Sequence, residues 1–201
     1  MSMTLATLIA VCAPLVHPAT LWALVTVESA AQPYAISLNY PERLQRSGRE
    51  LPVLVRQPRS AADALAAIQS LQARGYTVSV GLAQINVERL AWLHDQRIAG
   101  SVDALLDPCI NLQAAQAILL DCYQREQSAP AAKPSSPLHR MLSCYNAGDA
   151  ATGFRNGYVQ RVTRLAGRYT AARVPLVSVP GSMHPSVPQS ILSLTHAGEA
   201  R

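Results

Sequence analysis

The sequence lacks any apolar run long enough to cross a membrane. A spanning helix needs roughly 18 to 20 uninterrupted apolar residues, whereas the apolar start of the chain, residues 1–16, is interrupted by Cys12 and Pro14. The first residues also lack the Lys or Arg of a secretory leader, and no cleavage site of small residues follows them. The sequence therefore predicts no transmembrane span, and no export signal is evident in it.

The sequence also lacks a concentrated basic tract. It has 17 Lys and Arg residues against 12 Asp and Glu residues, a net charge of +5, and the basic residues are spread along the chain. A nucleic-acid-binding domain gathers its basic residues on one face or along one helix. We therefore expect no nucleic acid partner and interpret the excess as a solvated, Arg-rich surface.

None of the cysteines lies in a C-x-x-C pair, the spacing that is typical of zinc and redox sites. We accordingly expect no metal and no other cofactor. An even number of cysteines permits two disulfides, which would form in an oxidising compartment such as the periplasm. Four buried free thiols in a reducing compartment fit the count equally well. The four are Cys12, Cys109, Cys122 and Cys144.

The 201 residues, 49% of them hydrophobic, exclude a disordered protein and suit one globular domain. We expect a mainly α (α+β) fold with a small β-hairpin over residues 1–172. Prolines recur from residue 174 onward, so residues 173–201 are predicted to form a flexible, Pro-rich tail. Apolar spacing and capping residues predict helices over 5–12, 18–32, 60–74, 86–93, 101–106, 111–127, 137–145 and 156–168, with strands over 51–56 and 76–80.

The helix that starts at Pro18 carries a carboxyl group on its apolar face. Leu21, Leu24 and Val25 form this face, and Glu28 is the next position on it. Burial and the negative end of the helix dipole both disfavour a charged carboxylate, so the pKa of Glu28 should rise. A carboxyl group that is protonated near neutral pH can donate its proton to a glycosidic oxygen. The alternative is a glutamate at a helix end that simply reaches water.

Four separate motifs contain or follow this glutamate. They are Glu28-Ser29 with Pro33, Ala35, Ser37 and Asn39; Gly-Leu-Ala-Gln-Ile-Asn at 81–86; Asp107-Pro108-Cys109 with Asn111; and Tyr-Asn-Ala-Gly at 145–148 with Asn-Gly-Tyr-Val at 156–159. Their order and spacing over residues 5–168 closely resemble the lytic transglycosylases of the goose-type lysozyme fold, which implies a lysozyme-like helical domain. The long insertion before the second motif, with Arg-Gln-Pro at 56–58, resembles the branch that serves type IV secretion systems.

The resemblance gives Glu28 the role of the only catalytic acid and base. Ordinary glycosidases use two carboxylates, yet the segment after Glu28 offers only Glu42 and Glu50, both in a polar loop. One group suffices if Glu28 first protonates the leaving oxygen and then takes a proton from the muramyl C6 hydroxyl, which attacks C1. The expected product is a 1,6-anhydromuramyl end.

The resemblance also implies a set of substrate-binding residues. The two amides would bind sugar hydroxyls and N-acetyl groups, the serine would bind the substrate or the acid, and the two tyrosines would stack on sugars or orient Glu28. The set is Ser37, Gln84, Tyr145, Asn146 and Tyr158.

Several motif residues also have a structural interpretation. Asn86 suits a helix cap, Gly81 and Gly148 suit special backbone conformations, and Tyr145 suits a partly buried position. The chain departs from the family at Ala83, where a methionine usually lies against the sugar. We expect activity to survive this change with a wider or shallower subsite.

Relatives commonly carry a cysteine in the first helix and another in the Pro-Cys-x-Asn motif, so the resemblance implies a Cys12–Cys109 disulfide. Cys122 and Cys144 would form the remaining pair or stay reduced. The implied location is the periplasm, and the implied partners are peptidoglycan glycan strands and proteins of a type IV secretion or conjugation apparatus.

The implied activity is cleavage of the β-1,4 bond between N-acetylmuramic acid and N-acetylglucosamine. Two alternative functions remain. One is a hydrolytic lysozyme of the same fold. The other is a peptidoglycan-binding assembly factor without catalysis, which stays an alternative because Ala83 departs from the family pattern.

Overall fold

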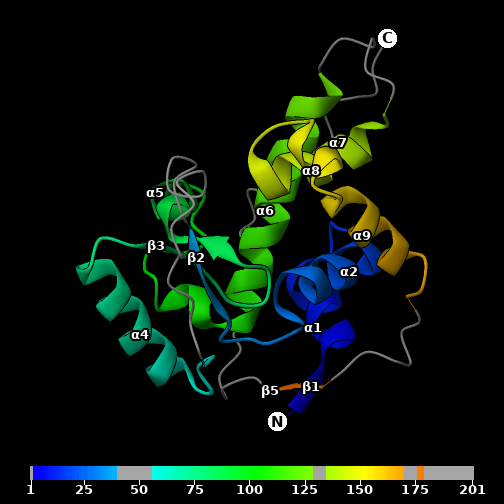
Figure 1. The fold of residues 1–201 in the computed structure, drawn as a ribbon. Coiled ribbons are helices and arrows are strands. Elements are labelled where there is room, and N and C mark those ends of the chain that lie inside the picture. The colour runs from blue at the N-terminus through cyan, green and yellow to red at the C-terminus, as the bar shows by residue number, and fades with distance from the viewer. Residues whose placement is uncertain (1, 40–55, 129–134, 170–175, 179–201) are drawn as a thin grey trace.

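A computed structural model describes residues 2–39, 56–128, 135–169 and 176–178 (Figure 1). The predicted strand over 51–56, apart from its last residue, lies outside these ranges. The helices are α1 (Leu5–Cys12), α2 (Pro18–Ser29), α4 (Ala61–Ala73), α5 (Leu90–Asp95), α6 (Pro108–Gln127), α7 (Pro137–Ala147), α8 (Thr152–Arg155), α9 (Tyr158–Ala166) and the 3-10 turns η1 (Val87–Arg89) and η2 (Ala104–Leu106). The strands are β1 (Ser2–Thr4), β2 (Ile36–Asn39), β3 (Thr77–Val80), β4 (Ile85–Asn86) and β5 (Leu176–Ser178).

Helix α6 runs through the middle of the molecule, with the small sheet and α4 on one side and α1, α2 and α9 on the other (Figure 1). It packs against α1 and α7, and half of its 20 residues are buried. This arrangement confirms the expected mainly α, lysozyme-like fold. Among the helices described, none combines the length and the apolar character that a membrane crossing requires.

Most helix starts follow the capping residues that the sequence predicted. Pro18 occupies the first turn of α2, and the Ser60 side chain accepts a hydrogen bond from the Asp63 amide at the start of α4. Helix α6 begins three residues earlier than expected, because Asp107 caps it and Pro108 fits its first turn. The last helix, expected over 156–168, is α9 and begins at Tyr158. Gly157, with a φ of 75°, separates it from the short helix α8, which the sequence did not predict.

Helix α2 ends at Ser29, before the proline that was expected to end it. Ala30 adopts a left-handed conformation with a φ of 52°, and its amide bonds back to the carbonyls of Thr26 and Val25. The Ser29 hydroxyl donates to Leu82 O at 2.7 Å, a contact 53 residues along the chain. A tertiary contact therefore accompanies the end of the helix.

The three-stranded sheet has the order β2-β3-β4 and is antiparallel. Ile36 lies opposite Val80, and Ser79 lies opposite Asn86. Strand β3 was predicted, whereas β2 and β4 were missed because four and two residues are too few to show an alternating pattern. The Gln57 side chain extends this edge by bonding both the amide and the carbonyl of Ile36.

Strand β5 lies within the predicted tail. Its backbone pairs with β1, with Ser2 opposite Ser178 and Thr4 opposite Leu176. The other residues of 173–201 lie outside the described part of the chain. The boundary after residue 172 stays a prediction, with this short pairing beyond it.

Two disulfides connect α6 to its neighbours. Cys12–Cys109 joins α1 to α6 over 97 residues, as the family resemblance implied, and Cys122–Cys144 joins α6 to α7. In the chain-entropy model, a cross-link over about a hundred residues stabilises by up to about 4.7 kcal/mol. The disulfides therefore fix the two ends of the central helix.

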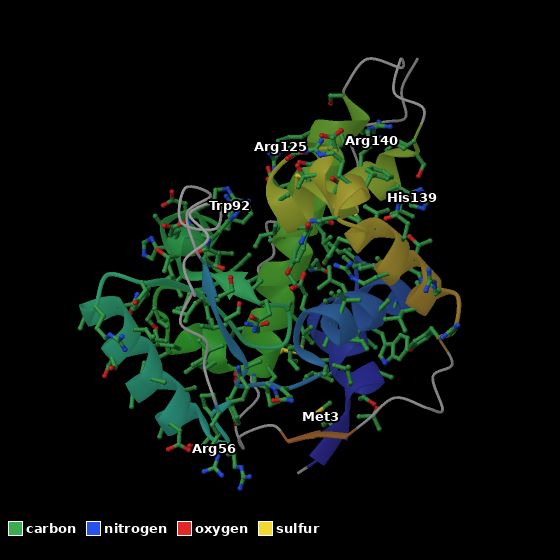
Figure 2. The ribbon with its side chains drawn as sticks, viewed as in Figure 1. Met3, Arg56, Trp92, Arg125, His139 and Arg140 are labelled. Carbon is green, nitrogen blue, oxygen red and sulfur yellow. A yellow bond between two sulfur atoms is a disulfide. The ribbon has the colours of Figure 1, made fainter. Side chains whose placement is uncertain are left out.

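Charged side chains also stabilise the C-terminal end of α6, next to the Cys122–Cys144 disulfide. The Arg140 side chain is almost fully buried, and its Nε donates to Glu126 Oε2 at 3.1 Å. Arg125 Nη2 contacts the Sγ atoms of Cys122 and Cys144 at 3.4 and 3.3 Å. Figure 2 shows both arginines at this end of the molecule.

Buried hydrogen bonds connect the start of α6 to the turn between β3 and β4. Asn111 is 1% exposed, and its Oδ1 accepts from the Ala83 amide while its Nδ2 donates to Val80 O and Leu105 O. The side chain of Asn111 fills the space where a Cβ on Gly81 would lie, since the two would be 2.1 Å apart. Gly81 also has a φ of 81°, which a residue with a side chain rarely adopts.

We expect Asn111→Ala to lower the free energy of unfolding by about 3 kcal/mol, because it leaves three buried backbone groups unpaired. Urea denaturation measures this. Gln72→Ala, at an exposed position on α4, is the control and should stay within about 0.5 kcal/mol of the parent chain. Equal effects of the two substitutions would contradict this role of Asn111.

Candidate active site

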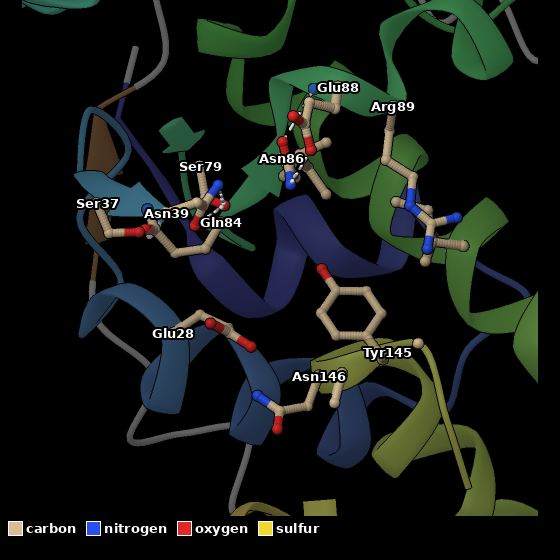
Figure 3. A pocket seen from close by; sticks show the side chains of 14 residues that line it. Glu28, Ser37, Asn39, Ser79, Gln84, Asn86, Glu88, Arg89, Tyr145 and Asn146 are labelled. Atoms are coloured by element: carbon tan, nitrogen blue, oxygen red, sulfur yellow. Dashed lines mark hydrogen bonds between the residues drawn. The ribbon is translucent and has the colours of Figure 1, made fainter. Parts of the chain in front are cut away.

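A pocket of about 610 Å3 lies between α2, the small sheet and the C-terminal end of α7 (Figure 3). Most of its lining is polar, and the polar groups are hydroxyls, amides, two carboxyls and one guanidinium. The lining residues are Glu28, Ser37, Asn39, Ser79, Gln84, Ile85, Asn86, Glu88, Arg89, Ile118, Tyr145, Asn146, Ala147 and Gly148.

Glu28 lies in the last turn of α2 with its carboxyl group at the pocket wall. Burial raises the pKa of Glu28 from 4.5 to about 7, although the hydrogen bond from Tyr158 and the charge of Arg161 both act to lower it. The predicted upward shift in the pKa of Glu28 is thus present, and its main cause is desolvation. Near neutral pH both protonation states of this carboxyl group are populated.

Tyr158 holds the carboxyl group from behind. Its Oη donates to Glu28 Oε1 at 2.6 Å, and its side chain is only 2% exposed and lies outside the pocket lining. The Arg161 guanidinium lies over the Tyr158 ring, with its Cζ atom 6.0 Å from the ring centroid. The sequence suggested two roles for Tyr158, stacking on a sugar or orienting Glu28. This geometry fits the second role, because the buried ring has no free face on which a sugar could stack.

Tyr145 and Gln84 line the pocket and also hold the turn of residues 81–84. Tyr145 Oη donates to Ala83 O at 2.7 Å, and burial raises the pKa of Tyr145 well above its usual value, which keeps this donor protonated. Gln84 Nε2 donates to Ala35 O and Gly81 O. The Tyr145 side chain is therefore partly structural, as the sequence suggested, and Gln84 has its Oε1 left for a ligand.

Asn146 and Ser37 are the most accessible of the predicted ligand residues. Asn146 Oδ1 accepts from Asn156 Nδ2, whose own Oδ1 accepts from the Tyr158 amide, so this chain of bonds connects the pocket to the residue behind Glu28. Ser37 lies exposed on β2 and lines the pocket. Its side chain makes no hydrogen bond to Glu28, both residues being among those described.

The structural interpretations of three further motif residues are confirmed. Asn86 Oδ1 accepts from the Glu88 amide and caps η1. Gly81 and Gly148 both have positive φ angles, and Gly148 ends α7. Ala83 is fully buried, and it is the backbone of this residue that bonds Asn111 and Tyr145.

Sequence reasoning missed two charged residues of the pocket. Glu88 and Arg89 follow the capping Asn86 and have the pattern of an ordinary first helical turn, so no local signal pointed to a site. The Glu88 carboxylate accepts from Thr77 Oγ1 at 3.1 Å and from Asn86 Nδ2 at 3.3 Å. The other two carboxyls considered, Glu42 and Glu50, lie outside the described residues.

The pocket supplies the partly protonated carboxyl group of Glu28, the carboxyl group of Glu88, several uncharged donors and acceptors, and the guanidinium of Arg89. Over the described ranges, no group of three or more His, Cys, Asp or Glu side chains is placed to hold a metal ion. This set suits acid–base chemistry on a neutral, hydroxyl-rich ligand such as a carbohydrate.

Comparisons with known proteins agree with this chemistry. A family model described as "Transglycosylase SLT domain" matches residues 8–164. "Type IV secretion system protein virB1" of Brucella abortus biovar 1 (strain 9-941) is 37% identical over 174 residues, which are 84% of this chain and 65% of that protein. "Protein virB1" of Agrobacterium fabrum is 34% identical over 155 residues, which are 77% of this chain and 56% of that protein. The chain thus spans less than two thirds of the length of these relatives. No solved structure matches it significantly.

The raised pKa of Glu28 predicts a pH-dependent stability. The folded state keeps this proton up to about pH 7, whereas the unfolded chain loses it near 4.5, so its stabilising effect is complete below 4.5 and is lost as the pH rises through 7. Glu28→Gln removes this loss. Relative to the parent chain, the variant should gain up to about 3 kcal/mol in free energy of unfolding between pH 4 and pH 8.

Urea denaturation at a series of pH values measures the difference, with Gln72→Ala as a control whose difference from the parent chain stays constant with pH. A constant difference for Glu28→Gln as well would show that Glu28 titrates at its ordinary pKa.

Proposed function

The chain belongs to the transglycosylase SLT domain family, and from this premise we propose that it is a peptidoglycan lytic transglycosylase. Its substrate is the β-1,4 bond between N-acetylmuramic acid and N-acetylglucosamine, and Glu28 is its catalytic residue. The observation that carries the proposal is a single carboxyl group with a pKa of about 7 at the wall of a polar pocket.

Glu28 acts in both halves of the reaction. The protonated carboxyl group donates to the glycosidic oxygen as the bond from C1 to that oxygen breaks. The resulting carboxylate then takes the proton of the muramyl C6 hydroxyl, whose oxygen forms a new bond to C1. No water is consumed, Glu28 ends protonated again, and the product is a 1,6-anhydromuramyl end.

The surrounding residues position the carboxyl group and the sugars. Tyr158 occupies Oε1 of Glu28, which leaves Oε2 for the proton transfers. The Asn146 amide, the Gln84 carbonyl and the Ser37 hydroxyl would bind hydroxyls and N-acetyl groups of the glycan. These neutral groups suit a substrate whose sugar rings carry no charge.

We place this activity in the periplasm, at a type IV secretion or conjugation apparatus that needs a local gap in the cell wall. The Brucella abortus relative, named as a type IV secretion system protein, supports the secretion context. The two disulfides support an oxidising compartment.

Glu28→Gln should abolish the release of anhydromuropeptides from purified peptidoglycan, because the amide keeps the shape of the side chain but transfers no proton. Mass spectrometry of the released fragments measures this, and anhydro ends differ from reducing ends by the mass of one water. Binding of the variant to sacculi, measured by co-sedimentation, should persist and shows that the fold is intact. Substantial lysis by this variant would remove Glu28 from the catalytic role.

The alternative function, a hydrolytic lysozyme, is best supported by Glu88, because this residue brings a second carboxylate to the same pocket. A hydrolase with two carboxylates would need both. In the proposed mechanism Glu88 transfers no proton, so Glu88→Gln should cost less than about 10-fold in rate and the products should keep anhydro ends. A loss of about 10² to 10⁴-fold, as expected for a missing acid or base, together with reducing ends from the parent chain, would favour the hydrolase.

A further inference from the structure

Arg89 is a cation in the pocket that the proposed reaction does not use. It lies at the junction of η1 and α5, is half-buried, and lines the pocket. Figure 3 shows it on the Tyr145 side of the pocket, opposite Ser37 and Asn39. Its charge acts on the Tyr145 phenol, favouring the ionised form, so the guanidinium lies near this wall of the site.

Among the residues that the structure describes, none pairs with this guanidinium. No hydrogen bond or ion pair joins Arg89 to any of them, and the neighbouring carboxylate of Glu88 instead accepts from Thr77 and Asn86. A half-buried cation loses part of its hydration. An anionic group of a ligand would therefore gain a charge-assisted hydrogen bond here without displacing an existing ion pair.

The chemistry of the substrate limits what this anion can be. The sugar rings of a peptidoglycan strand are neutral, and the lactyl carboxyl of each muramyl residue is tied up as an amide wherever a peptide is attached. The free carboxylates of such a strand are those of the peptide stems. The planar fork of an arginine matches a carboxylate in two parallel hydrogen bonds.

We infer that Arg89 binds a carboxylate of the peptide stem, on the Tyr145 side of the pocket, and so makes the enzyme prefer glycan strands that carry peptides. This inference rests on the proposed transglycosylase function. It assigns to the pocket a peptide-reading subsite beside its sugar-binding groups.

Three preparations of glycan strands test the inference with the full chain. The first carries native peptide stems. In the second, carbodiimide coupling with ammonium has converted the stem carboxylates to amides, which removes the charge and keeps the shape. In the third, an amidase has removed the peptides, so that the only carboxylates are those of the lactyl groups. The quantity measured is kcat/KM for anhydromuropeptide release.

The parent chain should favour native over amidated strands by about 10-fold, the size of one hydrogen bond to a charged group. In Arg89→Ala this ratio should fall close to one. The control is Arg164→Ala, which removes the same charge from an exposed position on α9 outside the pocket and should keep the ratio of the parent chain.

Two results would overturn the inference while the proposed function stands. One is an active parent chain with no preference between native and amidated strands. The other is a dependence on Arg89 that appears only with the peptide-free strands, which would assign the lactyl carboxylate as the ligand. A parent chain that releases no anhydromuropeptide from any preparation would instead contradict the proposed function itself.

Discussion

The turn of residues 81–84 is the constraint on which the site depends, because hydrogen bonds from four parts of the chain meet there. Asn111 of α6 and Tyr145 of α7 bond the backbone of Ala83, Ser29 of α2 bonds Leu82 O, and Ala35 O accepts from Gly81 and Gln84. The Asn111, Tyr145 and Ser29 side chains pair buried backbone groups of Leu82 and Ala83, and buried backbone groups need such partners. Since Ser29 follows Glu28 directly, the same bonds help to fix the position of the Glu28 carboxyl group.

The electrostatics of Glu28 follow from that position. Desolvation raises the pKa of Glu28, and the bond from Tyr158 with the charge of Arg161 limits the rise to about 7. A carboxyl group that stayed at 4.5 would be a poor acid near neutral pH, and one shifted much higher would be a poor base. In the proposed mechanism, a pKa between these two extremes lets the single residue serve both steps.

The sequence was informative where local chemistry decides structure. Pro18, Ser60 and Asn86 act in the helix starts that they predicted, and the apolar face of α2 led to Glu28. It was uninformative where the outcome depends on tertiary contacts. The end of α2 coincides with a contact 53 residues away, strands β2 and β4 are too short for a pattern, and Arg89 reaches the pocket only through the packing of η1 against the sheet.

The central claim is that Glu28 is held partly protonated by its surroundings, and an NMR titration of the full chain labelled with 13C at the glutamate carboxyl carbons tests it most directly. Glu28→Gln assigns the signal. Our account predicts a pKa of about 7 for Glu28 and a further rise in Tyr158→Phe, which removes the hydrogen bond that favours the charged form. A pKa near 4.5 in the parent chain, unchanged in Tyr158→Phe, would contradict it.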